Sequence, residues 1–152
     1  NVLANFYPES REVITENTAF LMANLLQGVV DEGTGRRLRF RYGFKNQIGG
    51  KTGTTQNHSD GWFIGITPDL AGGVWVGAED RSIHFQNLAN GQGASMALPI
   101  WALFMQKVYA DKSLAVPQSD FQKPNGVNHV LDCGDADREG MTDYDSSDEI
   151  FD

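Results

Sequence analysis

A single lysine stands among small residues in the stretch GGKTGTTQNHSDGWFIG, residues 49–65. The ammonium group of Lys51 is followed by the hydroxyl groups of Thr52 and Thr54, with Gly53 between them. A cation beside hydroxyl groups and exposed backbone is suited to bind an anion. Two chemistries fit this pattern: a phosphate held by a nucleotide-binding loop, or a carboxylate held beside a nucleophilic serine.

The phosphate interpretation fails on spacing and on context. A phosphate-binding loop requires a glycine five positions before the glycine of the Gly-Lys pair, and the residue five positions before Gly50 is Lys45. In such a loop the Lys-Thr pair also opens a helix, whereas TGTTQNHSDG consists of residues that form helices poorly. The carboxylate interpretation is therefore favoured.

A helix is predicted immediately before this region, at about residues 16–32. Thr15 or Asn17 can cap its start, and Glu16 is favourable in the first turn. Gly33 can end it, because glycine adopts a left-handed turn at little cost. Apolar residues at helical spacing predict its buried face: Met22, Leu25, Leu26, Val29 and Val30.

Three strands are predicted at residues 48–55, 61–67 and 72–80. Pro68 and Asp69 suit a tight turn between the second and third strands, and short connections favour antiparallel neighbours. The three strands should therefore form an antiparallel meander. Its aromatic and branched residues are expected in the core: Trp62, Phe63, Trp75 and Val76.

A second helix is predicted at about residues 95–110, with Pro99 in its first turn. A helix as apolar as this one needs a sheet to cover it. One face carries most of its large apolar residues, and two more widen that face: Ile100, Leu103, Phe104 and Val108, with Trp101 and Met105.

The composition indicates a globular chain with an acidic end. The 152 residues are 40% hydrophobic and 21% charged, which fits a single domain and excludes a disordered chain. Residues 132–152 contain nine acidic residues and one basic residue, Arg138, whereas residues 1–131 carry equal numbers of each sign. We therefore divide the chain into a body, residues 1–131, and an acidic tail that we expect to be disordered.

Metal and disulfide chemistry are not indicated. Cys133 is the only cysteine and has no activating partner in sequence, so it is interpreted as a free thiol. His58, His84 and His129 are too far apart to form a metal-binding pair at helical spacing.

Residues 34–48 are basic and contain no acidic residue. Arg36 to Lys45 could form a surface that binds nucleic acid or another anionic polymer, but no known binding motif accompanies them. A solvated loop or an edge strand with a positive face is favoured instead. A positive face near Lys51 would also attract an anionic substrate.

Three segments carry a resemblance to a known family. GTGRR, GGKTGTTQNHSDGWFIGITPDLAGGVWVG and PIWALFM occur in this order and resemble the C-terminal part of the transpeptidase domain of bifunctional (class A) penicillin-binding proteins. The resemblance covers about residues 10–110, and a weaker similarity extends over residues 121–132. It implies an α+β fold, a partial serine β-lactamase/transpeptidase-like domain. A helix would precede the antiparallel strands, and a C-terminal helix would pack on the sheet.

The resemblance also implies roles for the residues around Lys51. Lys51 would sustain a positive field and a proton-transfer network around a serine nucleophile. The hydroxyl groups of Thr52 and Thr54 would bind the terminal carboxylate of a peptide or a penicillin, and the Thr54 N–H would be one of two oxyanion donors. Gly53 would let the substrate backbone lie against the strand. Asp60 would support the strand edge through hydrogen bonds.

The nucleophile itself is missing from this chain. No serine is followed by Lys at the third position or by Asn at the second, so the Ser-x-x-Lys and Ser-x-Asn motifs of the family are expected upstream of Asn1. The chain would then be a fragment, inactive alone, whose open sheet face normally meets the upstream half of the same domain.

The complete protein implied by the resemblance cross-links peptidoglycan stem peptides, binds β-lactam antibiotics, needs no cofactor and does not bind nucleic acid. It would act outside the bacterial cytoplasmic membrane through an anchor that this chain lacks. A β-lactamase or D,D-carboxypeptidase relative, and a non-catalytic module that binds anionic polymers, remain alternatives.

Overall fold

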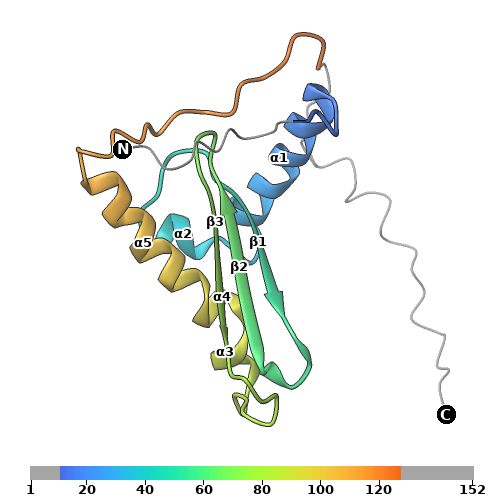
Figure 1. Cartoon of the computed structure of the whole chain (residues 1–152), viewed down its shortest axis with the longest axis vertical. Helices are drawn as coiled ribbons and strands as arrows, with labels where there is room; N and C mark the ends of the chain where they lie inside the picture. The colour runs from blue at the N-terminus through green and yellow to red at the C-terminus, as the bar shows by residue number, and fades with distance from the viewer. Residues whose placement is uncertain (1–10, 128–152) are drawn as a thin grey trace, which may run out of the picture.

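The computed structural model describes residues 11–127, and its centre is a three-stranded sheet with helices packed against it (Figure 1). The elements are α1 (Glu16–Asp31), α2 (Arg37–Phe40), β1 (Gly49–Thr54), a 3₁₀ turn (Gln56–His58), β2 (Asp60–Ile66), β3 (Ala71–Gly77), α3 (Leu88–Gly91), α4 (Gly93–Met96) and α5 (Leu98–Ala110). None of the described helices is long and apolar enough to cross a membrane.

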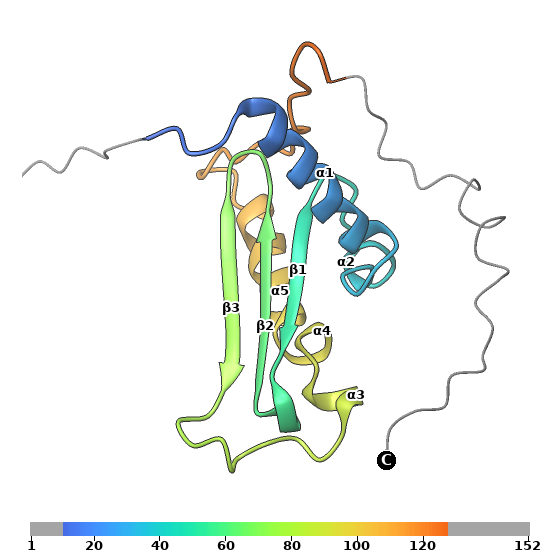
Figure 2. The same ribbon diagram turned by 90° about the vertical axis from the view of Figure 1, so that its right-hand side faces the viewer.

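The sheet is an antiparallel meander in the order β1-β2-β3, as predicted. Helices α4 and α5 cover one of its faces, and α1 packs beside β1 (Figure 2). β1 and β3 are both edge strands in the described part of the chain. The predicted α+β arrangement, with one helix before the strands and another packed on the sheet, is confirmed.

The core forms around Trp101 of α5, which is 1% exposed. Its indole lies over Gly65 of β2 and Gly72 of β3, and its Nε1 donates to the Gly72 carbonyl at 3.1 Å. A Cβ atom at Gly65 would come within 2.4 Å of the Trp101 ring, so only glycine leaves room for the indole here. The ring of Phe63 meets Trp101 edge-on, with 5.4 Å between centroids.

The predicted first helix is confirmed, but its buried face was only partly predicted. Thr15 caps the helix by accepting a hydrogen bond from the Thr18 N–H. Val30 is fully buried, whereas Met22 is 49% and Leu25 55% exposed. The physical reason is that α1 lies along the edge of the sheet, so only its C-terminal half packs closely against other described residues.

The helix ends near Gly33 for a different reason from the predicted left-handed turn. The backbone of Gly33 does not have a positive φ angle. A Cβ atom there would instead lie 2.9 Å from the Cα and carbonyl oxygen of Val29. Glycine is required because the chain passes close to the last turn of the helix.

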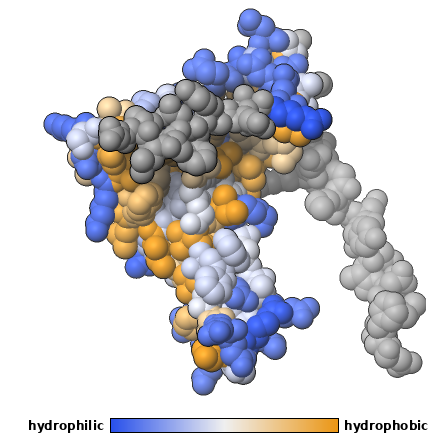
Figure 3. Space-filling model, viewed as in Figure 1, coloured by the Kyte–Doolittle hydropathy of each residue, from blue (hydrophilic) through white to orange (hydrophobic). Residues whose placement is uncertain are grey.

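The second predicted helix is also confirmed, but its buried face was only partly predicted: Trp101, Met105 and Val108 are buried as expected. The side chains that pack inward are Leu98, Trp101, Ala102, Met105 and Val108. Ile100, Leu103 and Phe104, which were predicted to be buried, are half exposed or more. Figure 3 shows a hydrophobic band over α5. The helix is apolar on more than one side, so periodicity alone could not select the side that meets the sheet.

The sheet face opposite α5 is apolar and largely uncovered by the residues that the structure describes. Trp62, Ile64 and Trp75 are each between 45% and 49% exposed, so the expectation that Trp62 and Trp75 are core residues was wrong. Phe63 is fully buried and Val76 half-buried, because they point to the helix-covered face. Alternation along a strand sends neighbouring residues to opposite faces, and here only one face is covered.

The basic segment is not an edge strand, and only part of it is the predicted solvated loop. It contains the short helix α2, and Leu38 within it is fully buried. As a result, Arg37 and Arg39 form contacts within the protein instead of adding to an exposed positive surface. The acidic tail, His129 and Cys133 lie outside the described residues.

Candidate active site

The outer edge of β1 is the centre of the candidate site. The Thr55 N–H donates to the Asp60 carbonyl at 3.1 Å, which identifies Thr55 as a residue whose backbone groups face β2. In an antiparallel pair this orientation alternates, so the N–H and C=O of Thr54 and Thr52 point away from β2, to the free edge. Two backbone donors of the predicted motif are therefore available to a ligand.

Lys51 and the two threonines lie on opposite faces of the sheet. Lys51 is opposite Ile64 on the open face, whereas Thr52 is opposite Phe63 on the helix-covered face. The exposed Lys51 side chain nevertheless reaches the edge, where its Nζ donates to the Thr52 carbonyl at 2.8 Å. The cation and the hydroxyl groups therefore meet only along the edge of β1.

Two other segments contact the hydroxyl groups of Thr52 and Thr54, which lie on the helix-covered face. Thr34, in the turn after α1, has its Oγ1 2.8 Å from the Oγ1 of Thr52. The N–H of Gly93, at the start of α4, donates to the Oγ1 of Thr54 at 3.1 Å. Neither contact was predicted from the sequence. The GTG of residues 33–35 and the glycine-rich run before α4 were the available signals.

Two arginines of the basic segment hold this edge together and are not free to bind a polymer. Arg37 donates to the Ala94 carbonyl at 2.9 Å and to the Ser95 hydroxyl at 3.0 Å, which ties α2 to α4. Arg39 forms an ion pair with Asp31 at 2.7 Å and also donates to the carbonyls of Phe44 and Asn46. The predicted positive face is therefore smaller than the sequence suggested.

Asp60 organises the far end of the strand pair, as the sequence analysis proposed. Its carboxylate accepts hydrogen bonds from the hydroxyl groups of Thr55 and Ser59 and from the indole Nε1 of Trp75, each at 3.1 Å. Arg81 lies 3.9 Å away. Desolvation raises the pKa of Asp60, but the three hydrogen bonds and the charge of Arg81 outweigh it, so the pKa lies below its ordinary value of 3.8.

This shift predicts an acid-sensitive hairpin. Because the folded state holds the pKa of Asp60 below the unfolded value, its contribution to stability is complete above about pH 4 and is lost as the pH falls through the folded-state pKa. We expect Asp60→Asn to be less stable than wild type near neutral pH, with a difference that shrinks below pH 4. Thermal melts of both chains from pH 7 to pH 2.5 test this, and a difference independent of pH would contradict it.

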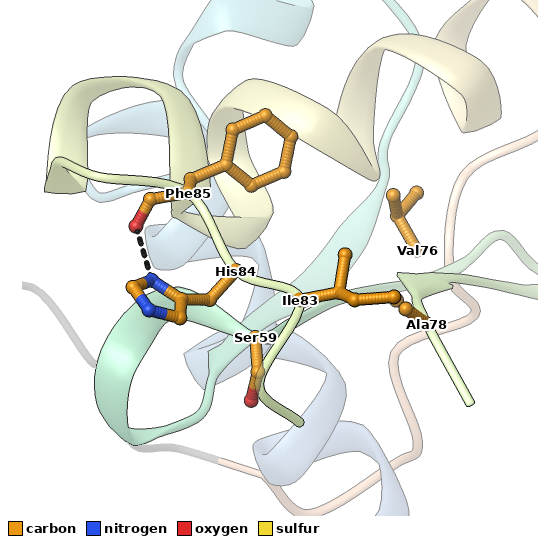
Figure 4. Close-up of a pocket in the computed structure, with 7 residues that line it drawn as sticks. Ser59, Val76, Ala78, Ile83, His84 and Phe85 are labelled. Carbon is orange, nitrogen blue, oxygen red and sulfur yellow. Dashed lines mark hydrogen bonds between the residues drawn. The ribbon is translucent and has the colours of Figure 1, made fainter. Parts of the chain in front are cut away.

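A separate cavity of about 290 Å³ lies where β3 ends (Figure 4). Val76, Ile83 and Phe85 give it apolar walls, and His84 lies beside it with Nδ1 3.0 Å from the Phe85 carbonyl. None of residues 51–54 lines this cavity. In the described part of the chain, no group of three His, Cys, Asp or Glu side chains could hold a metal ion.

Comparison with known proteins identifies the family to which this edge strand belongs. The family described as "Penicillin binding protein transpeptidase domain" matches residues 7–95, which is more than half of the chain. The chain belongs to this transpeptidase family. The match includes α1, all three strands and the Lys-Thr-Gly edge.

Individual relatives agree with the class A resemblance. Penicillin-binding protein 1A of Aquifex aeolicus is 34% identical over 123 residues, which cover 81% of this chain and 16% of that protein. Penicillin-binding protein 1A of Pseudomonas aeruginosa is 36% identical over 125 residues, which cover 80% of this chain and 14% of that protein. The chain thus spans about one sixth of the length of these relatives.

A solved structure supports the same assignment at the level of the fold. Penicillin-binding protein 1A from Haemophilus influenzae matches with a TM-score of 0.63 and 28% sequence identity. The match covers 74% of this chain and 17% of that one. The predicted transpeptidase-like fold is therefore confirmed for this chain, which covers part of a transpeptidase domain.

Proposed function

We propose that this chain contributes the Lys-Thr-Gly wall of a serine acyl-transfer site that cross-links peptidoglycan. The observation that supports this most directly is the register of β1 and β2. It leaves the Thr54 N–H at the free edge, where an oxyanion donor is needed, with Lys51 and two threonine hydroxyl groups beside it. The nucleophilic serine and its Ser-x-x-Lys and Ser-x-Asn motifs are supplied by residues outside this chain.

In the complete enzyme, the serine hydroxyl attacks the carbonyl of the penultimate D-alanine of a D-Ala-D-Ala stem peptide. The terminal D-alanine leaves as the amine, and an acyl-enzyme ester remains. An amine of a neighbouring stem peptide then attacks the ester, forms the cross-link and releases the serine. No cofactor takes part, and a β-lactam enters the same site by opening its ring.

Each residue of the edge has a defined part in this reaction. Lys51 supplies a positive field and a path for the serine proton, and the Thr54 N–H stabilises the oxyanion. The hydroxyl groups of Thr52 and Thr54 bind the substrate carboxylate, while Gly53 lets the substrate backbone approach the strand. The Thr54 hydroxyl already accepts from Gly93, and its own proton is still available to a carboxylate.

The partner of the open sheet face is, in this proposal, the upstream half of the same domain. Trp62, Ile64 and Trp75 form an apolar surface that a folded protein rarely leaves in water. Lys51 lies on this same face, so a segment that covers it would bring its own residues to the lysine. The body, residues 1–131, would form part of the domain, and the tail, residues 132–152, would lie outside it.

A membrane-anchored parent acting outside the cytoplasmic membrane is part of the same proposal. Stem peptides are cross-linked there, and relatives of this chain are named as penicillin-binding proteins. A nucleic-acid binder is disfavoured because Arg37 and Arg39, two of the cations it would use, are already bound to protein oxygens.

Fluorescent penicillin tests the proposal. The 152-residue chain alone should form no covalent adduct, because it lacks the nucleophile. A complete domain that adds the upstream segment with Ser-x-x-Lys and Ser-x-Asn should be labelled at that serine. Intact-mass spectrometry with and without excess unlabelled penicillin distinguishes specific from random acylation. A specific adduct on the isolated chain, or no adduct on the complete folded domain, would contradict the proposal.

A further inference from the structure

The turn after α1 places a third hydroxyl group at the edge of β1. The Oγ1 of Thr34 lies 2.8 Å from the Oγ1 of Thr52, although the two residues are 18 positions apart. The pair is exposed. Helix α1, from which this turn leads, lies on the side of β1 away from β2 (Figure 2), and the Thr52 backbone N–H and C=O point to that side. A ligand at this edge would therefore meet both hydroxyl groups.

The backbone holds Thr34 firmly in this position. The N–H of Gly33 donates to the Gly28 carbonyl at 3.1 Å, and the N–H of Gly35 donates to the Val29 carbonyl at 2.8 Å. A Cβ atom at Gly33 or Gly35 would approach the Val29 backbone to 2.9 or 3.1 Å. The two glycines thus anchor the turn against the end of α1 and fix the direction of the threonine between them.

The number of hydroxyl protons determines which threonine of the Thr34–Thr52 pair is the donor. Each threonine has one O–H to donate, and at 2.8 Å one of the pair donates to the other. If Thr52 gives its proton to a substrate carboxylate, it has none left for Thr34. Thr34 must then be the donor, and Thr52 accepts from it while donating outward. A chain of this kind strengthens each of its hydrogen bonds.

We propose that Thr34 is a positioning residue that aligns the Thr52 hydroxyl so that it donates to the substrate carboxylate. This inference rests on the proposed function, and it adds to it a residue outside the Lys-Thr-Gly strand. It also assigns a specificity: Thr34 discriminates in favour of acyl donors that carry a free carboxylate, and it does not affect the acylation chemistry itself.

The test uses the complete transpeptidase domain and two acyl donors, benzylpenicillin and its methyl ester. Thr34→Val keeps the shape of the side chain and removes its proton. We expect it to lower the second-order acylation rate constant for benzylpenicillin by about 3- to 10-fold, the range of one net hydrogen bond. For the ester, which lacks the anionic acceptor, the change should stay below about 2-fold. Thr34→Ser keeps the hydroxyl group and should retain the wild-type preference.

Thr18→Val is a matched control, because Thr18 also forms an exposed hydroxyl pair, with Thr15 at 2.9 Å, but in the first turn of α1. It should leave both rates unchanged. A double-mutant cycle shows whether Thr34 acts through Thr52. If it does, Thr34→Val has no further effect on benzylpenicillin in a Thr52→Val background. A loss that persists in this background would mean direct contact with the carboxylate and would overturn the positioning role.

Two failures can be told apart. If Lys51→Ala acylates like wild type, the proposed function fails, whatever Thr34 does. If Lys51→Ala is slow but Thr34→Val changes both donors equally, or neither, only the role of Thr34 is overturned. Circular dichroism of each variant confirms that the compared proteins are folded.

Discussion

Replacement of Lys51 by alanine should slow penicillin acylation of the complete transpeptidase domain on the order of 10²-fold or more, while the fold survives. The magnitude is that of losing a positioned acid–base group. The fold should tolerate the change because Lys51 is exposed and its ammonium contacts only the carbonyl of the next residue among the hydrogen bonds of the described chain. Its loss opens no cavity in the core.

Two changes at Thr54 serve as comparisons. Thr54→Ala keeps the backbone N–H and should slow acylation less than Lys51→Ala. It should also reduce stability by about 1 kcal/mol, because the Gly93 N–H loses its acceptor. Thr54→Pro removes the outward N–H itself and should slow acylation as strongly as Lys51→Ala. Proline also constrains the backbone, but at an edge position that points away from β2 it removes no bond of the ladder.

The measurement is the second-order acylation rate constant of each variant, with circular dichroism as the control for folding. The expected order of rates is wild type, then Thr54→Ala, then Lys51→Ala and Thr54→Pro together. If folded Lys51→Ala is acylated at the wild-type rate, the lysine is only part of a polar strand edge, and the proposed role of this wall is wrong.

The elements of this fold could be predicted because their signals are local. Thr15 is a helix cap, Pro68 and Asp69 form a turn, and Pro99 opens a helix. Each feature acts within a few residues of its own position. The Lys-Thr-Gly edge could be found for a similar reason, since its residues are consecutive on one strand.

The inward faces could not be predicted because they depend on what covers each element. Leu25 and Trp62 are apolar and follow the expected periodicity, yet both are about half exposed. In the described chain, α1 reaches that side of the sheet near Gly49, and Trp62 stays 45% exposed. Ile100 and Trp101 are neighbours on an apolar helix. Trp101 is the one that points inward, because Gly65 and Gly72 leave space for its indole.

The contacts that complete the candidate site are between distant segments, and no spacing in the sequence reveals them. Thr34 reaches Thr52 from the turn after α1, and Gly93 reaches Thr54 across 39 positions. Arg37 was expected on a solvated positive face, but in the fold it donates to the carbonyl of Ala94. Tertiary packing decides such partners.

Gly93 is the position at which one added methyl group should do the most damage to this site. A Cβ atom there would lie 2.3 Å from the Trp62 carbonyl oxygen and 2.4 Å from that of Gly53. Both atoms belong to the β1–β2 backbone and cannot rotate away. Gly93→Ala must therefore push α4 off the sheet or distort β1, and it weakens the hydrogen bond to the Thr54 hydroxyl in either case.

We expect Gly93→Ala to destabilise the domain by about 3 kcal/mol, the upper part of the usual range for overpacking, and to slow penicillin acylation as well. Gly28→Ala is the matched control, because no atom lies within 4 Å of a Cβ at Gly28 and the residue is inside α1. It should stabilise the domain by roughly 0.5–1 kcal/mol, since alanine favours a helix more than glycine does. Urea unfolding of the two variants beside wild type measures both effects. Equal stability of Gly93→Ala and wild type would mean that α4 does not rest on β1 and β2 in solution. The Thr54 hydroxyl would then be free of α4, and its fixed place at the strand edge would need another cause.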